Sequence, residues 1–218
     1  MARKVTRLTL DTLATLPEPV RTCLFWELDP VHRERARRAG ELASEKDAWL
    51  SRVLLDWGSA GRVLQVDGDV AGFVTYAPPF YFPGSASLPT APIGPDAVQL
   101  STAYVAPEFR GQGLGRVLLQ SMAKDLLQRG GIRSVEAFGS RSLTGHSHEP
   151  CALPADFLLR VGFKTQRPHA RHPRLRLELK SILTWREEVE AALEKLVDAV
   201  RPTRLRKPAP NARADRRS

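Results

Sequence analysis

The chain has 218 residues, of which 42% are hydrophobic and 26% are charged, values that are ordinary for a globular protein. No apolar run approaches the roughly 20 residues that a membrane span needs, and the N-terminus lacks the apolar core of a signal peptide. These features exclude a membrane-embedded class and predict a cytoplasmic protein, while the formal net charge of +9 adds nucleic acid as a partner class to weigh.

The positive charge is concentrated at the C-terminus. Residues 201–218 contain seven arginines and lysines against one aspartate. Proline, alanine and arginine dominate this stretch and large apolar side chains are nearly absent, so it predicts a basic disordered tail over residues 202–218. A solvated tail without a partner, a tail that contacts nucleic acid and a tail that contacts acidic proteins are the interpretations left open.

The first third of the chain predicts helices between strands. The expected elements are, in order, a strand over 5–10, helices over 12–17, 19–26 and 32–55, and paired strands over 62–66 and 70–76. Asp11 or Thr12 is placed to cap the first helix, and Gly40 marks a break in the third. Asp67-Gly68 lies between the two strands and is a strong signal for a hairpin.

The chain has two cysteines, which do not make a disulfide framework. Cys23 lies in an apolar run and is interpreted as a small buried hydrophobic residue. Cys151 lies in a polar loop and is interpreted as a surface thiol.

A glycine-dense turn follows the middle of the sequence. A strand over 98–105 is followed by Arg110-Gly111-Gln112-Gly113-Leu114-Gly115-Arg116 and then by an amphipathic helix to about residue 129. Glycine permits a positive φ and close approach of a ligand, and the first amides of a helix have no partner within it. Such a turn binds phosphate well. It is not a P-loop, because no Gly-Lys-Ser/Thr follows, and the third Rossmann glycine is replaced by Arg116.

The last part of the chain predicts a strand over 132–138, a polar loop over 139–150, a short helix over 155–161 and a last strand over 175–183. Alternation along that last strand puts Arg174 and Arg176 on an exposed face. Thr184 to Glu187 forms a capping box, which predicts an extra helix over 184–201. The apolar stripe of this helix packs either on its own domain or in a homodimer contact.

Two landmarks give the chain a resemblance to a known family. The pattern Val105-x-Pro107-x-x-Arg110-Gly111-x-Gly113-x-Gly115 resembles the pyrophosphate loop of the GNAT N-acetyltransferases. The segment from Phe157 to Gly162-Phe163 resembles a second landmark of that family, a short helix that ends in Gly-Phe. The resemblance implies the GNAT-type acyl-CoA N-acyltransferase fold over residues 1–183, an α/β (α+β) architecture with a mixed central sheet flanked by helices.

The resemblance also implies an activity. The protein would transfer acetyl from acetyl-CoA to a primary amine, on a small molecule or a protein, by direct attack in a ternary complex. The residues that would hold the donor are the family's strand and loop positions: Ala103, Tyr104 and Val105 toward the pantetheine arm, and Arg110, Gly111, Gln112, Gly113, Leu114, Gly115 and Arg116 toward the pyrophosphate.

The sequence departs from the family at the chemical step. The family tyrosine that protonates the leaving thiolate aligns with Leu158, and the strand over 98–105 offers no carboxylate as a base, so no catalytic residue is assigned. Substitute groups are, in chain order, Glu27, Asp29, Tyr76, Tyr81, Tyr104 and Glu136. The alternative is a catalytically degenerate acyl-CoA-binding sensor or interaction module, associated with nucleic acid through its tail.

The loop from His146 to Cys151 contains the side-chain types of a metal site, including His148 and Glu149. No second cluster in the sequence completes it, so no metal is expected.

Overall fold

The computed structural model describes residues 2–18, 20–141 and 151–182. The chain divides into one compact unit over Met1–Ile182 and a second over Leu183–Ser218. The helix predicted over 184–201 and the tail predicted over 202–218 lie outside the described residues. Within the described ranges no helix combines the length and the apolar character that crossing a membrane requires.

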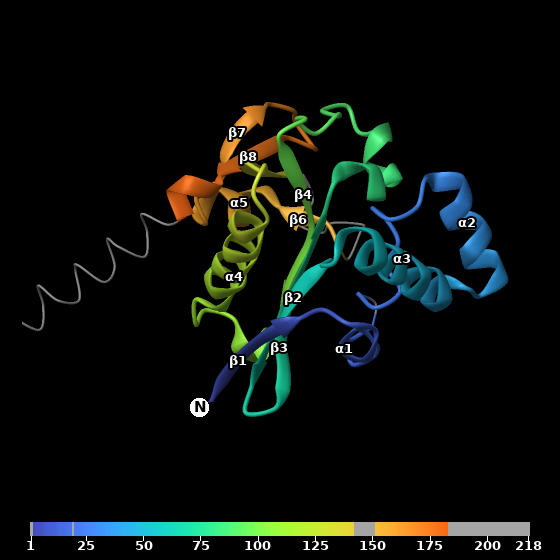
Figure 1. The fold of residues 1–218 in the computed structure, drawn as a ribbon. Helices are drawn as coiled ribbons and strands as arrows, with labels where there is room; N and C mark the ends of the chain where they lie inside the picture. Colours follow the sequence, from blue (N-terminus) through green and yellow to red (C-terminus); the bar gives the residue numbers. More distant parts are fainter. Residues whose placement is uncertain (1, 19, 142–150, 183–218) are drawn as a thin grey trace, which may run out of the picture. The chain divides into compact units, whose positions relative to one another are not determined.

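A mixed sheet of eight strands forms the centre of the first unit, as Figure 1 shows. The strands are β1 (Arg3–Arg7), β2 (Gly61–Val66), β3 (Asp69–Ala77), β4 (Ala97–Val105), β5 (Ser134–Ser140), β6 (Leu153–Pro154), β7 (Lys164–Arg167) and β8 (Arg174–Glu178). Their order is β1-β2-β3-β4-β5-β8-β7, with β6 beside β5. All pairs are antiparallel except β4 with β5 and β5 with β6. This is the α+β architecture that the sequence predicted.

Helices cover both faces of the sheet (Figure 1). One face carries α1 (Leu10–Ala14), α2 (Pro30–Ala39) and α3 (Leu42–Trp57), and the other carries α4 (Leu114–Arg129) and α5 (Ala155–Arg160). On the α4 side, Leu118, Met122 and Leu126 recur at helical spacing and are fully buried. Burial of each such side chain is worth roughly 1.5–3 kcal/mol, so this stripe fixes α4 on the sheet.

Local sequence signals explain several boundaries. Asp29 caps α2 by accepting from the amides of Val31 and His32, and Gly40 ends that helix with φ 73°. Asp67 has φ 52° and Gly68 has φ 100°, the left-handed pair that a tight hairpin between β2 and β3 requires.

Other boundaries differ from the predictions. Thr9, not Asp11 or Thr12, caps α1, because its side chain and that of Thr12 bond reciprocally to backbone amides. The described residues of 19–26 form turns instead of a helix. Tertiary contacts override helix propensity there, since the carbonyl of Cys23 accepts from the Lys46 ammonium.

The last strand is shorter than predicted. β8 ends at Glu178, and the chain is already helical from Leu179 to the last described residue, Ile182. Leu179 and Ile182 are both buried, at the i, i+3 spacing of one helical face. The predicted strand over 175–183 therefore extends too far.

Candidate functional site

β4 and β5 separate in the middle of the sheet and form a fork. Their parallel pairing covers three residue pairs, from Ala97 with Ser134 to Gln99 with Glu136. Beyond Gln99, β4 has no strand hydrogen-bonded on its β5 side within the described part of the chain. A register irregularity against β3 adds Ser101 as an extra residue of β4 at this point. The fork therefore leaves β4 backbone groups free to pair with an extended ligand.

The glycine turn connects the end of β4 to the start of α4. Gly111 (φ 79°) and Gly113 (φ 76°) are left-handed, and the N-cap position of α4 is Gly113, which has no side chain to cap the helix. Among the described residues, the amides of 111–115 donate to no backbone carbonyl or side chain. Consecutive unpaired amides at the positive end of a 16-residue helix are well suited to bind phosphate oxygens.

One hydrogen bond braces the turn, and one glycine lets α5 pack beside it. The Arg110 Nε donates to the carbonyl of Val105 at 3.0 Å, so this arginine braces the loop against β4. A Cβ on Gly115 would lie 3.2 Å from the Phe157 ring, which explains the glycine as the residue that lets α5 approach α4. The predicted donor-binding residues thus lie on one continuous path from Ala103 to Arg116.

Comparison with known proteins identifies the family. Residues 23–144 match the family model described as "Acetyltransferase (GNAT) family". The chain belongs to the GNAT family. No curated protein matches the sequence.

Three solved structures share the fold of this GNAT chain. The PaiA N-acetyltransferase from Thermoplasma acidophilum, in complex with coenzyme A, is 16% identical with a TM-score of 0.53, over 82% of this chain and 99% of that one. An N-acetyltransferase from Staphylococcus aureus Mu50 is 15% identical with a TM-score of 0.52 and the same coverage. The aminoglycoside acetyltransferase AAC(6')-Ib, in complex with coenzyme A, is 15% identical with a TM-score of 0.52, over 85% and 99%.

Two of the three tyrosines of this GNAT chain are committed to buried structural contacts. The Tyr76 hydroxyl donates to Asp125 of α4 at 2.8 Å, and burial raises the pKa of Tyr76. Tyr81 donates to Asp56 at 3.3 Å, and burial likewise raises its pKa. The ring of Tyr104 packs on Phe73, with centroids 5.8 Å apart, in the core of the α1–α3 face.

The three candidate carboxylates also have structural partners. Asp29 caps α2, and the His32 amide lowers its pKa most. Glu27 is fully buried and its Oε1 pairs with Lys46 at 2.5 Å, while its Oε2 has no hydrogen-bond partner among the residues that the structure describes. Glu136 is 1% exposed and lies between Arg174 and Arg176, each at 3.0 Å.

The two arginines of β8 correct the prediction of an exposed basic face. The side chains of Arg174 and Arg176 are only 14% and 18% exposed. Arg176 also forms two hydrogen bonds to Asp96, which lowers the pKa of that carboxyl, and Arg174 donates to the carbonyl of Pro92. Strand alternation could not reveal this, because the loop that covers these residues comes from a distant part of the sequence.

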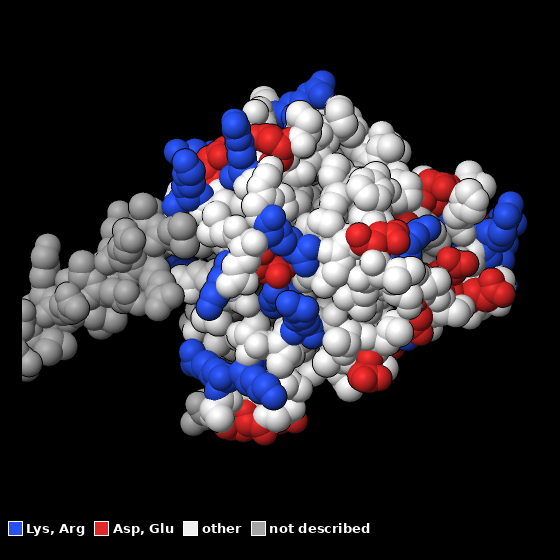
Figure 2. All heavy atoms as spheres, viewed as in Figure 1, with Lys and Arg blue, Asp and Glu red and all other residues white. Residues whose placement is uncertain are grey.

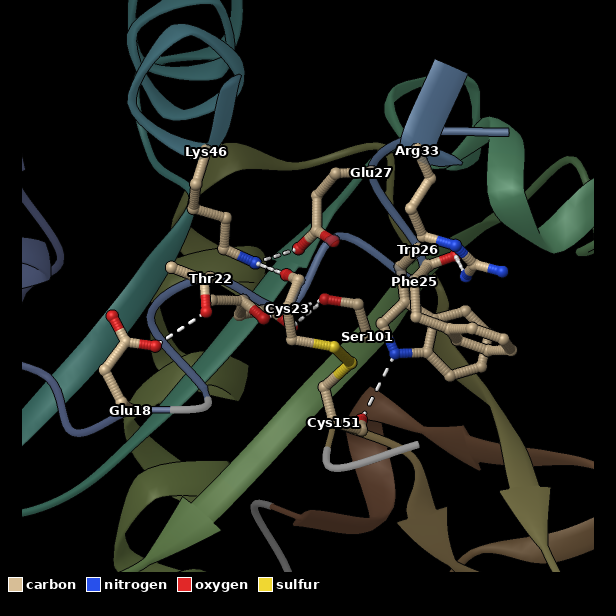
Figure 3. Close-up of a disulfide and its surroundings, with 11 residues drawn as sticks. Glu18, Thr22, Cys23, Phe25, Trp26, Glu27, Arg33, Lys46, Ser101 and Cys151 are labelled. Carbon is tan, nitrogen blue, oxygen red and sulfur yellow. Dashed lines mark hydrogen bonds and ion pairs between the residues drawn. A yellow bond between two sulfur atoms is a disulfide. The ribbon is translucent and has the colours of Figure 1, made fainter. Parts of the chain in front are cut away.

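The cysteines correct a second prediction. Cys23 and Cys151 form a disulfide, and Cys151 is buried instead of exposed. Figure 3 shows the bond beside Trp26, whose Nε1 donates to the Cys151 carbonyl at 3.2 Å. The even number of cysteines was the only sequence signal, and their separation of 128 residues gave no hint of contact.

Charge on the described surface is mixed. Figure 2 shows basic and acidic side chains interspersed on one face, without a field of a single sign across it. In the part of the chain that the structure describes, no three His, Cys, Asp or Glu residues are grouped as metal ligands. The segment from His146 to Glu149 lies outside the described residues.

Proposed function

We propose that this GNAT protein is an N-acetyltransferase that transfers the acetyl group of acetyl-CoA to a primary amine by direct attack in a ternary complex. The observation that carries the proposal is the fork in the sheet, which leads into a turn with unpaired amides over residues 111–115. An extended arm pairs along an open strand edge, and a pyrophosphate binds at a helix N-terminus. This chain offers both features consecutively.

The donor site is proposed from the residues along this path. Backbone groups of Ala103, Tyr104 and Val105 pair with the pantetheine arm. Amides from Gly111 to Gly115, including those of Gln112, Gly113 and Leu114, donate to the pyrophosphate oxygens, whereas the Arg116 amide donates to the Gly113 carbonyl at 3.0 Å. Arg110 keeps the loop on β4. Bound in this way, the donor brings an activated acetyl thioester to the fork.

The chemical step needs few groups from the protein. The amine, once deprotonated, attacks the thioester carbonyl, and the tetrahedral oxyanion accepts from a backbone N–H of β4. The C–S bond then breaks, the CoA thiolate takes up a proton, the attacking nitrogen gives up a proton to solvent, and the acetyl amide is released. Leu158 stands at the family's acid position and is fully buried, so solvent supplies that proton in this protein.

The donor site is tested by introducing a negative charge at one exposed position of the turn. Gln112→Glu places a carboxylate among the amides that bind phosphate, and Gln112 is exposed, so folding is preserved. We expect Kd for acetyl-CoA, measured by calorimetry, to rise at least about tenfold, a loss of about 1.4 kcal/mol. The matched control is Gln128→Glu, the same change on an exposed residue near the other end of α4.

The control variant should bind like the wild type. Equal weakening in both variants, or a folded wild-type protein that does not bind acetyl-CoA, would contradict the proposed site. If binding is intact, release of the CoA thiol in the presence of amine panels identifies the acceptor class.

A second function is favoured by the surroundings of the candidate catalytic positions. Leu158 is buried at the acid position, and Glu27, Asp29 and Glu136 all have structural partners. These features fit an acyl-CoA-binding sensor without catalysis. Micromolar acetyl-CoA binding, with no thiol release for any amine tested, would favour the sensor over the enzyme.

A further inference from the structure

The disulfide joins two segments that meet at the fork. Cys23 and Cys151 are 8% and 3% exposed, and their Cα atoms are 6.4 Å apart, within the range for disulfides. One half of the bond, Cys23, belongs to the segment that follows α1, and the other, Cys151, lies two residues before the start of β6. The bond therefore links the part of the chain before the fork to the part after it.

The chain from residue 151 to 155 crosses the sheet inside the fork. Cys151 packs in the core of the α1–α3 face, whereas Ala155 begins α5 on the opposite face. Between them, Leu153 and Pro154 of β6 pair with Gly139 and Ser140 of β5, beyond the point where β4 has separated. β6 therefore occupies the β5 side of the fork, and the chain enters the fork at the disulfide-bonded Cys151.

The other partner of the disulfide is a firmly anchored segment, residues 23–28. Lys46 donates to the Cys23 carbonyl at 2.8 Å and pairs with Glu27. The Trp26 ring stacks on Phe138 of β5 at 6.0 Å, and its carbonyl accepts from the Gly84 amide at 3.0 Å. Figure 3 shows Lys46, Glu27 and Trp26 around the bond. The disulfide therefore ties β6 to a fixed support.

We propose that the Cys23–Cys151 disulfide is a reversible positioning cross-link that fixes β6 in the fork and so holds the face from which an acceptor reaches the donor. Only the statement about the acceptor face rests on the proposed function. In that function the donor binds on the α4 side and leaves the α1–α3 side for the acceptor. The loop over residues 111–116 follows Arg110, which is bonded to the Val105 carbonyl of β4, so this support does not include the disulfide.

The redox step is thiol–disulfide exchange. A dithiol reductant attacks one sulfur, forms a mixed disulfide and then closes its own disulfide, which leaves Cys23 and Cys151 as two thiols. Reoxidation removes two electrons and two protons from the pair and passes them to a disulfide or diamide oxidant. The burial of both sulfurs makes exchange depend on opening of the fork segment.

The existence of the bond is tested first, on the full chain. Oxidised and reduced protein are unfolded, alkylated and digested, and their peptides are weighed. We expect a linked peptide pair containing Cys23 and Cys151 in the oxidised sample alone, and a melting temperature roughly 5–15 °C higher in the oxidised form. Complete alkylation of both thiols after oxidation would overturn the proposal.

Its positioning role is tested by amide hydrogen exchange. We expect several-fold faster exchange at residues 24–28 and 152–155 in the reduced form, and unchanged exchange at 111–116. In the control, Cys23→Ala/Cys151→Ala, dithiol should change nothing. Equal exchange at both segments in the oxidised and reduced wild type would also overturn the proposal.

The proposed function and the proposed cross-link can be contradicted independently of each other. Acetyl-CoA should bind the oxidised and reduced forms with the same Kd, because its loop does not depend on the bond. Failure of both forms to bind would contradict the proposed function and leave the exchange result to decide the cross-link. Normal binding with unchanged exchange would remove the cross-link alone.

Discussion

Asp125 connects three side chains beneath α4. It is 5% exposed, accepts from Tyr76, and pairs with Arg62 at 2.6 Å and Arg129 at 3.3 Å. Burial alone would raise the pKa of this carboxyl, but the Tyr76 hydrogen bond and the two arginines outweigh it and lower the pKa. A depressed pKa in the folded state means that the unfolded chain binds the proton more tightly.

This stabilisation should therefore depend on pH in a defined direction. It is fully present above the ordinary value of 3.8 and is lost as the pH falls through the lower folded-state pKa. Asp125→Asn should lower the unfolding free energy by about 3 kcal/mol at pH 7, and the difference from wild type should shrink in acid. Urea unfolding across this pH range measures both.

The control for this change is Asp69→Asn, on an exposed residue of the β3 end. It should cost less than about 0.5 kcal/mol. A constant difference between Asp125→Asn and wild type at every pH would contradict the role of the charge.

Glu136 provides a second comparison at the scale of single residues. It accepts from the Gly94 amide at 3.2 Å in addition to its two arginines, and so ties the loop before β4 to β5 and β8. Glu136→Gln should destabilise the protein by about 3 kcal/mol, because the partly buried Arg174 loses its carboxylate partner and Arg176 keeps only Asp96 and Glu178. Glu178→Gln is the matched control, since its carboxylate also contacts Arg176 but is 56% exposed.

The control should cost less than about 1 kcal/mol in the same urea titration. Similar losses for the two variants would show that burial does not decide the strength of these pairs. Sequence alone offered no way to rank them, because both residues occupy strands.

At the scale of elements, the short 3-10 helix over Pro83–Ser87 packs against the segment before α2. A Cβ on Gly84 would overlap the carbonyl oxygens of Phe25 and Leu28, so that position admits only glycine. Gly84→Ala should therefore cost about 3 kcal/mol or more of unfolding free energy, through displacement of backbone.

Gly40→Ala is the natural comparison for that change. Its Cβ would meet nothing within 4 Å, but its φ of 73° is left-handed, so only conformational strain of about 1 kcal/mol is expected. Thermal or urea unfolding distinguishes the two costs. Equal losses would mean that the packing of the Pro83–Ser87 3-10 helix contributes nothing.

Elements with strong local signals could be predicted from the sequence. The hairpin at Asp67-Gly68 and the helix break at Gly40 follow from glycine and turn chemistry, and both are confirmed. The helix predicted over 19–26 was wrong because Lys46 and Gly84 take its backbone groups from outside the segment. Long-range contacts of this kind have no counterpart in local periodicity.

At the scale of the whole molecule, the fold and family were predicted from two landmarks, the glycine turn and the segment ending in Gly162-Phe163, and both predictions are confirmed. The donor-binding residues stay a prediction. The disulfide and the passage of β6 through the fork could not be predicted, because both depend on segments brought together only by the complete sheet.

The short pairing of β4 with β5 also affects the order in which the strands pair during synthesis. Strands β1 to β4 and helices α1 to α4 all lie before residue 130, and the strand pairing of β4 with β5 covers three residue pairs. The N-terminal part can thus pair its strands on the ribosome while the rest is still being made. Until β5 has been synthesised, one edge of β4 is exposed to other nascent chains. Cys23 likewise cannot form its disulfide until Cys151, more than a hundred residues later in the chain, has been made.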